Sequence, residues 1–65
     1  MNVLLNGRKE EVEAKTVTDL VNALGLTPET ILVEHNGTAL LRSEWPQTRL
    51  ADDDQLEVLR VAAGG

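Results

Sequence analysis

Two Asn-Gly dipeptides, Asn6-Gly7 and Asn36-Gly37, constrain the fold of this chain more than any other feature. Asn and Gly readily adopt the positive φ angles that a two-residue hairpin turn requires. An alternating segment from Asn2 to Asn6 precedes the first pair, and an apolar segment from Ile31 to His35 precedes the second. The dipeptides therefore predict two β-hairpins. Their returning strands are expected at about Glu10 to Ala14 and at Thr38 to Leu41.

A helix is predicted between the two hairpins. Thr16 suits an N-cap, and Asp19 stands three residues later, where a capping box places an acidic side chain. Gly25 is a typical residue to end the helix. The apolar residues between them recur at helical spacing and predict one stripe that faces the core: Val17, Leu20, Val21 and Leu24.

The second half of the chain predicts one further strand. The segment from Arg42 to Ala51 has no regular pattern, apart from a short helical turn around Ser43-Glu44-Trp45 that Pro46 is expected to stop. Asp52-Asp53-Asp54 indicates a turn. The last strand is expected from about Gln55 to Val61.

The order strand, strand, helix, strand, strand, strand is typical of an α+β protein with the β-grasp (ubiquitin-like) fold. In that fold a mixed sheet of about five strands packs on one main helix, and the first and last strands are parallel neighbours. Residues 1–61 are expected to form this domain. Residues 62–65, Ala62-Ala63-Gly64-Gly65, lack the bulk for core packing and are expected to form a flexible tail.

Composition argues against several classes of function. The chain has 65 residues with one His, no Cys and no Tyr, which leaves little material for an enzyme active site. A net charge of -5 disfavours nucleic acid as a partner. The apolar runs are too short for a membrane span and no basic leader is present, so we expect a cytoplasmic protein that does not bind membranes.

No bound metal or cofactor is expected either. His35 has no second His or Cys with which to share a metal, and we interpret it as structural. Asp52-Asp53-Asp54 does not match the spacing of an EF-hand loop and is interpreted as a solvated turn. Trp45 is expected mainly to cap the core, while the role of Arg42 is left open between an acidic neighbour and a partner protein.

Several segments, spread over essentially the whole chain, together resemble one family. They are the opening strand with Asn6-Gly7, Thr16-Val17 leading into Leu20 and Leu24, Val33 to Gly37, Arg42 spaced before Trp45, Leu50 before the Asp-rich turn, Leu56-Glu57-Val58, and Gly64-Gly65. The Arg42-Ser43-Glu44-Trp45 cluster and the terminal glycines are the more specific of these. With them the chain resembles the ThiS family, the sulfur carriers of thiamine biosynthesis. One departure is Asp53, which stands where the family usually has Gly.

The resemblance implies that chemistry is performed on the carboxylate of Gly65. An ionised carboxylate is a poor electrophile and needs a leaving group before it can accept sulfur. The resemblance implies a partner similar to ubiquitin-activating enzymes, which uses ATP to form an acyl-adenylate. It also implies sulfur from a cysteine desulfurase, a Gly65 thiocarboxylate, and thiazole synthase as the acceptor of the sulfur.

The tail and two leucines are the candidate partner contacts. Ala62, Ala63 and Gly64 are expected to enter a partner's active-site channel, because four extended residues reach about 13 Å and glycine suits a narrow passage. Leu4 and Leu59 are expected to face away from the helix on adjacent strands and to be exposed together as a docking patch. The alternative is that they are two isolated surface leucines, which are common.

Other functions remain open on the sequence alone. The small subunit of molybdopterin synthase is also a Gly-Gly-tailed sulfur carrier, and related carriers serve tRNA thiolation or cysteine synthesis. The short chain and the spacing from Arg42 to Trp45 favour thiamine biosynthesis. Two further alternatives are a ubiquitin-like modifier, in which Gly65 would form an isopeptide bond, and a β-grasp interaction module in which the tail has no role.

Overall fold

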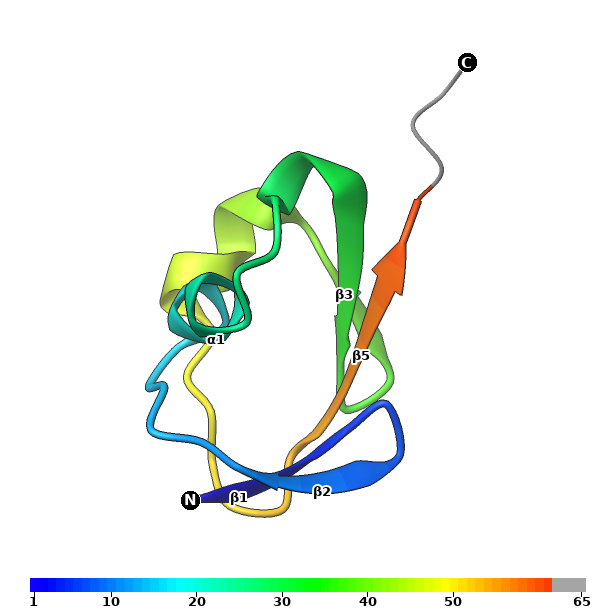
Figure 1. Cartoon of the computed structure of the whole chain (residues 1–65). Helices are drawn as coiled ribbons and strands as arrows, with labels where there is room; N and C mark the ends of the chain where they lie inside the picture. Colours follow the sequence, from blue (N-terminus) through cyan, green and yellow to red (C-terminus); the bar gives the residue numbers. More distant parts are fainter. Residues whose placement is uncertain (62–65) are drawn as a thin grey trace.

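The computed structural model describes residues 1–61, in which five strands and one α-helix form two layers (Figure 1). The strands are β1 (Asn2–Leu5), β2 (Arg8–Glu11), β3 (Ile31–His35), β4 (Thr38–Leu40) and β5 (Gln55–Arg60). The helices are α1 (Val17–Ala23) and the 3₁₀ turns η1 (Pro28–Thr30) and η2 (Arg42–Gln47). The expected tail, residues 62–65, lies outside the described part of the chain.

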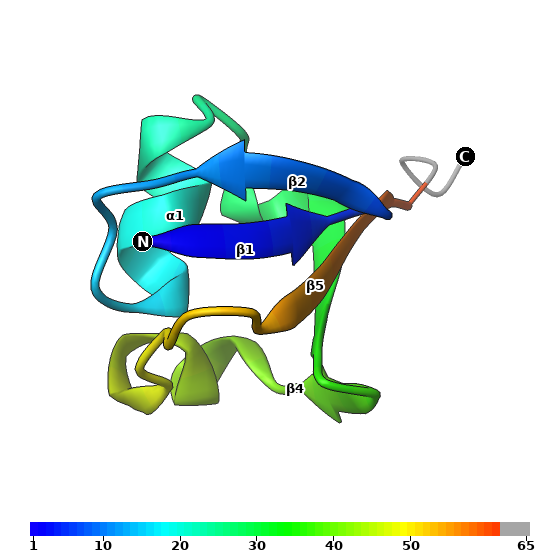
Figure 2. The same cartoon turned by 90° about the horizontal axis from the view of Figure 1, so that it is seen from below.

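The strands form one mixed sheet in the order β2-β1-β5-β3-β4, and α1 lies across one face of it (Figure 1). β1 and β5 are parallel, whereas β1–β2, β3–β4 and β3–β5 are antiparallel. Figure 2 shows β2, β1 and β5 side by side. The last strand of the sequence therefore occupies the middle of the sheet, and the predicted β-grasp architecture is confirmed.

Both Asn-Gly pairs form the predicted hairpin turns. Asn6 and Gly7 have φ angles of 51° and 81°, and Asn36 and Gly37 have 51° and 85°. The expected start of the second strand was wrong, because the two-residue turn pairs Leu5 with Arg8 directly. β2 is an exposed edge strand of four charged residues, so no apolar alternation indicates where it begins.

The helix begins as predicted, with a capping box. The Asp19 N–H donates to Thr16 Oγ1 at 3.2 Å, and the Thr16 N–H donates to Asp19 Oδ2 at 3.3 Å. Leu24 was expected in the buried stripe, but this prediction was wrong, because Leu24 is the C-cap residue and is exposed. Gly25 follows with a φ angle of 69°, as a glycine that ends a helix does.

We had expected Pro46 to stop the short helical turn, but it lies inside η2. The turn is held by hydrogen bonds that do not need the N–H group that proline lacks. The Glu44 N–H donates to the Leu41 carbonyl at 2.9 Å and the Thr48 N–H donates to the Trp45 carbonyl at 3.3 Å.

Aliphatic side chains from both layers and one tryptophan make up the core. α1 contributes three residues and the sheet contributes Val3, Ile31, Val33 and Leu56. Trp45 and Leu50 are also buried in this cluster, and Trp45 is only 4% exposed. The core therefore lies between α1 and one face of the sheet, and the opposite face of the sheet is left uncovered.

Candidate functional site

The end of β5 fixes the place from which the candidate tail extends. β5 is antiparallel to β3, so Arg60 pairs with Ile31 at the start of β3. The Val61 N–H then donates to the Thr30 carbonyl at 2.9 Å. The chain is thus hydrogen-bonded to its neighbour up to the last described residue. Residues 62–65, to which we assigned channel entry and sulfur attachment, follow directly and lie outside the described residues.

Three leucines lie on the uncovered face at this end of the sheet. Leu59 on β5 is paired with Leu32 on β3, and the two are 45% and 53% exposed. Leu41 follows β4 and is 68% exposed. The pairing of Leu40 with Val33 places Leu41 next to Leu32 in the continued register. We call Leu41, Leu32 and Leu59 the leucine row.

We had expected Leu4 to lie beside Leu59, but the structure does not place these two residues together. The parallel register pairs Leu4 with Gln55, four residues before Leu59, which corresponds to about 13 Å along a strand. Leu4 is also partly buried. The expected shared patch of these two residues was therefore wrong in its geometry, although both strands present the uncovered face.

Sequence reasoning missed Leu32, which is the neighbour that Leu59 has. A signal was available, because Leu32 lies between Ile31 and Val33, two residues that both point into the core. Strand alternation then sends the Leu32 side chain to the opposite face. The register between β3 and β5, which brings Leu32 and Leu59 together, could not be obtained from this alternation.

Asp54 forms a polar cluster that joins the second hairpin to the turn before β5. Its Oδ2 lies 2.8 Å from His35 Nε2 and accepts from the Ala51 N–H at 2.9 Å, and its Oδ1 accepts from Asn36 Nδ2 at 3.1 Å. Burial by itself raises the pKa of Asp54, but the hydrogen bonds from His35, Asn36 and Ala51 outweigh it and hold the pKa below 3.8. Both His35 and Asp54 are thus engaged within the fold.

The rest of the Asp-rich turn joins the beginning of β1. Asp52 Oδ1 accepts from the Asn2 N–H at 2.9 Å, and the Asp53 N–H donates to the Asn2 carbonyl at 2.7 Å. Asp53 has a φ angle of 70°, in the left-handed region that favours glycine. Within residues 1–61 no group of three potential metal-binding side chains comes together.

Arg42 and Trp45 lie at the same end of the molecule as the leucine row. Arg42 Nη1 is 3.8 Å from Glu29 Oε2, and both side chains are largely exposed, so this pair contributes little to stability. The indole N–H of Trp45 is buried and has no hydrogen-bond acceptor among the described residues. A hollow lined by Leu32, Arg42, Trp45 and Val61, among others, opens here.

Taken together, the sheet order, the parallel β1–β5 pair and the single covering helix define a ubiquitin-like β-grasp protein. The model of the ThiS family matches residues 3–65 of the chain. The chain therefore belongs to the ThiS family, the sulfur carriers of thiamine biosynthesis. No helix in the described residues is long and apolar enough to cross a membrane.

Solved structures and curated relatives agree with this assignment. The crystal structure of the thiamine biosynthesis protein ThiS from Geobacter metallireducens has a TM-score of 0.84 and is 36% identical, with both chains fully covered. An NMR structure of a thiamine biosynthesis protein from the same organism has a TM-score of 0.81 and 35% identity, with all of this chain and 88% of that chain covered. The sulfur carrier protein ThiS of Thermus thermophilus is 33% identical over 97% of this chain and 98% of its own length.

A second curated relative is much longer than this chain. The thiazole synthase of Magnetococcus marinus is 36% identical over the full length of this chain, which spans only 20% of that protein. The polypeptide of that thiazole synthase therefore contains a region similar to this chain.

Proposed function

We propose that the chain carries sulfur as a thiocarboxylate on Gly65 and delivers it for thiazole formation in thiamine biosynthesis. The observation that carries this proposal is the end-to-end match to a sulfur carrier protein ThiS, together with the placement of the β5 end. β1 pairs with the start of β5, and β3 pairs with β5 as far as Arg60, after which the Val61 N–H bonds to the Thr30 carbonyl. The globular body therefore presents residues 62–65 from a fixed point on its surface.

The chemistry proceeds in two steps, the first at the α-phosphorus of ATP and the second at the Gly65 carbonyl carbon. A carboxylate oxygen attacks the α-phosphate of ATP, pyrophosphate leaves, and an acyl-adenylate forms. The terminal sulfur of a desulfurase persulfide, released at the sulfide level by a thiol reductant that is oxidised to a disulfide, then attacks the acyl carbon, and AMP leaves with the electrons of the C–O bond. One oxygen is thereby replaced by sulfur, and the product is a nucleophile that can attack a carbonyl carbon. The chain itself supplies the acceptor carboxylate and no catalytic group.

The partners follow from this chemistry. We propose an ATP-dependent adenylating enzyme of the ubiquitin-activating type, a cysteine desulfurase as the sulfur source, and thiazole synthase as the acceptor. The thiazole synthase relative supports the last of these, because a region similar to this chain lies within the same polypeptide. ATP would be bound by the adenylating enzyme and not by this chain, and the cytoplasm is the compartment we propose for the reaction.

The uncovered face beside the β5 end is the proposed docking surface. Leu59 remains a candidate contact, now together with Leu32 and Leu41, because these three exposed side chains lie at the end of the sheet from which the tail extends. Leu4 remains a candidate on the same face, about 13 Å away along the strands. Docking there would bring the tail to the mouth of a partner's channel while the core stays undisturbed.

The intact mass of the protein tests this proposal. We expect incubation with the cognate adenylating enzyme, ATP and a sulfur donor to add the mass difference between sulfur and oxygen, on the Gly65-containing peptide. A variant that lacks Gly64 and Gly65 serves as the control and should not change in mass. An unchanged mass of the wild-type protein, with an enzyme shown to be active, would overturn the proposal. A lysine-linked adduct in cells would instead indicate a modifier.

A further inference from the structure

Two glutamates face each other across β3 and β5 on the uncovered face of the sheet. Glu34 and Glu57 are direct register partners, one alternation step from the pair Leu32 and Leu59. Like charges placed directly opposite each other destabilise a sheet, because their side chains are close in space. On its other side Glu34 is paired with Ala39, which offers no charge.

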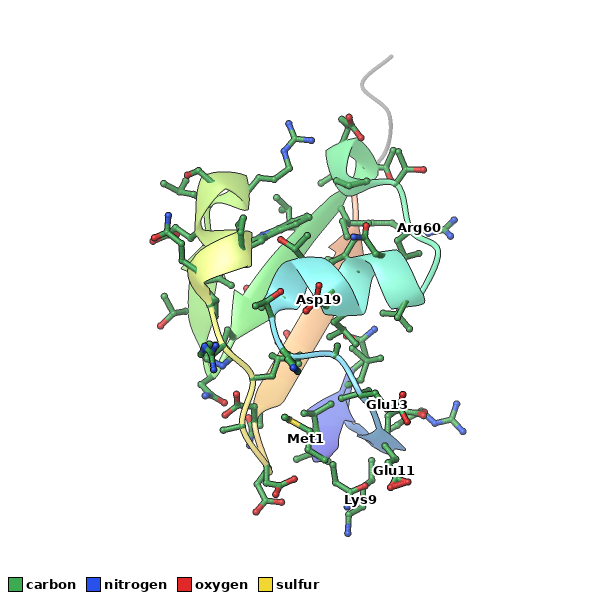
Figure 3. All side chains as sticks on the ribbon, turned by 90° about the vertical axis from the view of Figure 1, so that its left-hand side faces the viewer. Met1, Lys9, Glu11, Glu13, Asp19 and Arg60 are labelled. Carbon is green, nitrogen blue, oxygen red and sulfur yellow. The ribbon has the colours of Figure 1, made fainter. Side chains whose placement is uncertain are left out.

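No cation in the described residues neutralises this pair. The ion pairs within residues 1–61 are His35 with Asp54 and Arg42 with Glu29, and neither includes Glu34 or Glu57. Arg60 on β5 alternates to the helix side with the buried Leu56. Lys9 on β2 is paired with Leu4 on β1, and Leu4 is in turn paired with Gln55 on β5. The whole of β1 therefore separates Lys9 from β5. Figure 3 shows Lys9 and Arg60 at opposite ends of the molecule.

The uncovered face thus combines an apolar row with an unneutralised negative pair. The leucine row lies at the β5 end, and the two glutamates lie next to it, on the side away from the tail. Residues two apart along a strand are separated by about 7 Å. A protein surface that complements this face needs an apolar patch and, about 7 Å from it, a positive charge.

We propose that the uncovered face docks a protein surface on which an arginine or lysine side chain enters between Glu34 and Glu57, beside an apolar patch that covers the leucine row. This inference rests on the proposed function and assigns the surface to the ATP-dependent adenylating enzyme. The glutamate pair destabilises the free carrier, and the partner's cation removes that repulsion in the complex. The glutamate pair thereby lowers the stability of the isolated carrier and raises its affinity for the adenylating enzyme.

The two roles of the pair can be separated by substitution. Repulsion is a property of the pair, so E34Q or E57Q alone should remove it, and the double variant should be no more stable than a single one. Attraction to a cation is summed over both carboxylates, so the double variant should lose more affinity than either single variant. The variant E10Q/E11Q on β2 is the matched control, because it changes the net charge by the same amount.

The test measures the thermal midpoint of each variant and the KM of the carrier for its adenylating enzyme. The KM is obtained from the rate of ATP–pyrophosphate exchange. We expect E34Q, E57Q and the double variant to have raised midpoints. We expect the KM of the double variant to rise on the order of tenfold, with kcat unchanged, which is at the low end for close charge pairs at interfaces. The control should retain the KM of the wild-type protein, and high salt should weaken wild-type binding more than binding of the double variant.

Two results would overturn the inference, and they differ from each other. If the double variant has a raised midpoint but the KM of the control, the pair is a feature of the free protein and recruits no cation. If the wild-type carrier itself supports no exchange and gains no sulfur with an active enzyme, the proposed function fails and the inference fails with it.

Discussion

The side chain of Asn6 takes the place of the backbone in the pairing with Val58. Asn6 Oδ1 accepts from the Val58 N–H at 2.8 Å, and Asn6 Nδ2 donates to the Val58 carbonyl at 3.3 Å. The Asn6 N–H still donates to the Leu56 carbonyl at 2.8 Å, as in a regular parallel pair. The main chain turns away at Asn6, and its carboxamide extends the contact between β1 and β5 by one step.

Replacing Asn6 by Gly should therefore destabilise the domain even though glycine suits the turn. Asn6→Gly keeps the positive φ angle but removes both hydrogen bonds to Val58. With a net value of about 1 kcal/mol for each bond, the free energy of unfolding should fall by about 1–2 kcal/mol. Urea denaturation measures this change. An unaltered midpoint would mean that the turn geometry alone explains the asparagine.

Replacing Asp53 by Gly should stabilise the protein. Asp53 has a φ angle of 70° and its backbone N–H, which bonds to Asn2, is kept in the variant. Relief of the left-handed conformation should raise the free energy of unfolding by about 0.5–1 kcal/mol. Asp52→Gly is the matched control and should destabilise, because it removes the acceptor of the Asn2 N–H. Equal effects of both substitutions would contradict this explanation.

The stability of the domain should fall in acid through Asp54. The folded-state pKa of Asp54 lies below its ordinary value of 3.8, so its carboxylate stabilises the fold above that pH. That contribution is lost as the pH falls through the lowered pKa of the folded protein. Asp54→Asn should be less stable at neutral pH and should show a flatter decline below pH 4.

Thermal midpoints between pH 2 and pH 7 measure this effect. Asp53→Asn removes the same charge one residue away and serves as the control. Parallel acid limbs for the wild-type protein and Asp54→Asn would show that the cluster of Asp54 with His35 and Asn36 does not account for the acid dependence.

Substitutions in the leucine row should weaken docking and leave the fold intact. Leu59→Ser and Leu32→Ser remove apolar surface that a partner would cover, so each should raise the KM for the adenylating enzyme on the order of fivefold to tenfold. Their unfolding midpoints should stay close to that of the wild-type protein, because both residues are exposed. Leu24→Ser, exposed near the end of α1, is the control for lost apolar area.

The same experiment decides whether Leu4 belongs to the docking surface. Leu4→Ser should raise the KM only if the partner extends about 13 Å along the sheet from the leucine row. A KM equal to that of Leu24→Ser would restrict docking to the end of the sheet near Val61. If the row variants also match the control, the docking surface lies elsewhere.

Gly64→Ala should impair activation without unfolding the domain. Residues 1–61 contain the hydrophobic core, so the thermal midpoint should not change. A Cβ at this position should hinder passage through a narrow channel and lower the rate of thiocarboxylate formation by tenfold or more, on the order expected for a misplaced reacting group. Ala63→Gly is the control and should react at the wild-type rate. Normal turnover of Gly64→Ala would contradict a narrow channel.

Most of the fold could be predicted from the sequence because its strongest signals are local. The two Asn-Gly turns mark the connections of β1 with β2 and of β3 with β4, and the capping box marks the start of α1. The apolar stripe identifies the buried side of that helix, so none of these signals requires information about distant residues. β2 was misplaced because an edge strand of charged residues has no alternation to detect. Pro46 was misinterpreted because the hydrogen bonds on either side of it hold the turn.

The site was predicted less well, because it depends on register between distant strands. Alternation correctly sent Leu59 away from the core, but it carries no information about which residue of another strand lies beside it. That choice is made by contacts such as the Leu4 N–H to the Asp54 carbonyl, 50 residues apart, at 2.8 Å. This contact keeps Leu4 beside Gln55, and the antiparallel register of β3 with β5 makes Leu32 the neighbour of Leu59.

The central position of β5 has a consequence for how this protein is made. The two hairpins are synthesised first, but they are not neighbours in the sheet and have only β5 to join them. A ribosome must therefore pass residue 60 before the sheet can close, and a chain that ends between β4 and β5 contains both hairpin sequences without the strand that joins them. Chains truncated before β5 are therefore expected to remain unfolded and to be sensitive to proteases, because no strand joins their two hairpins.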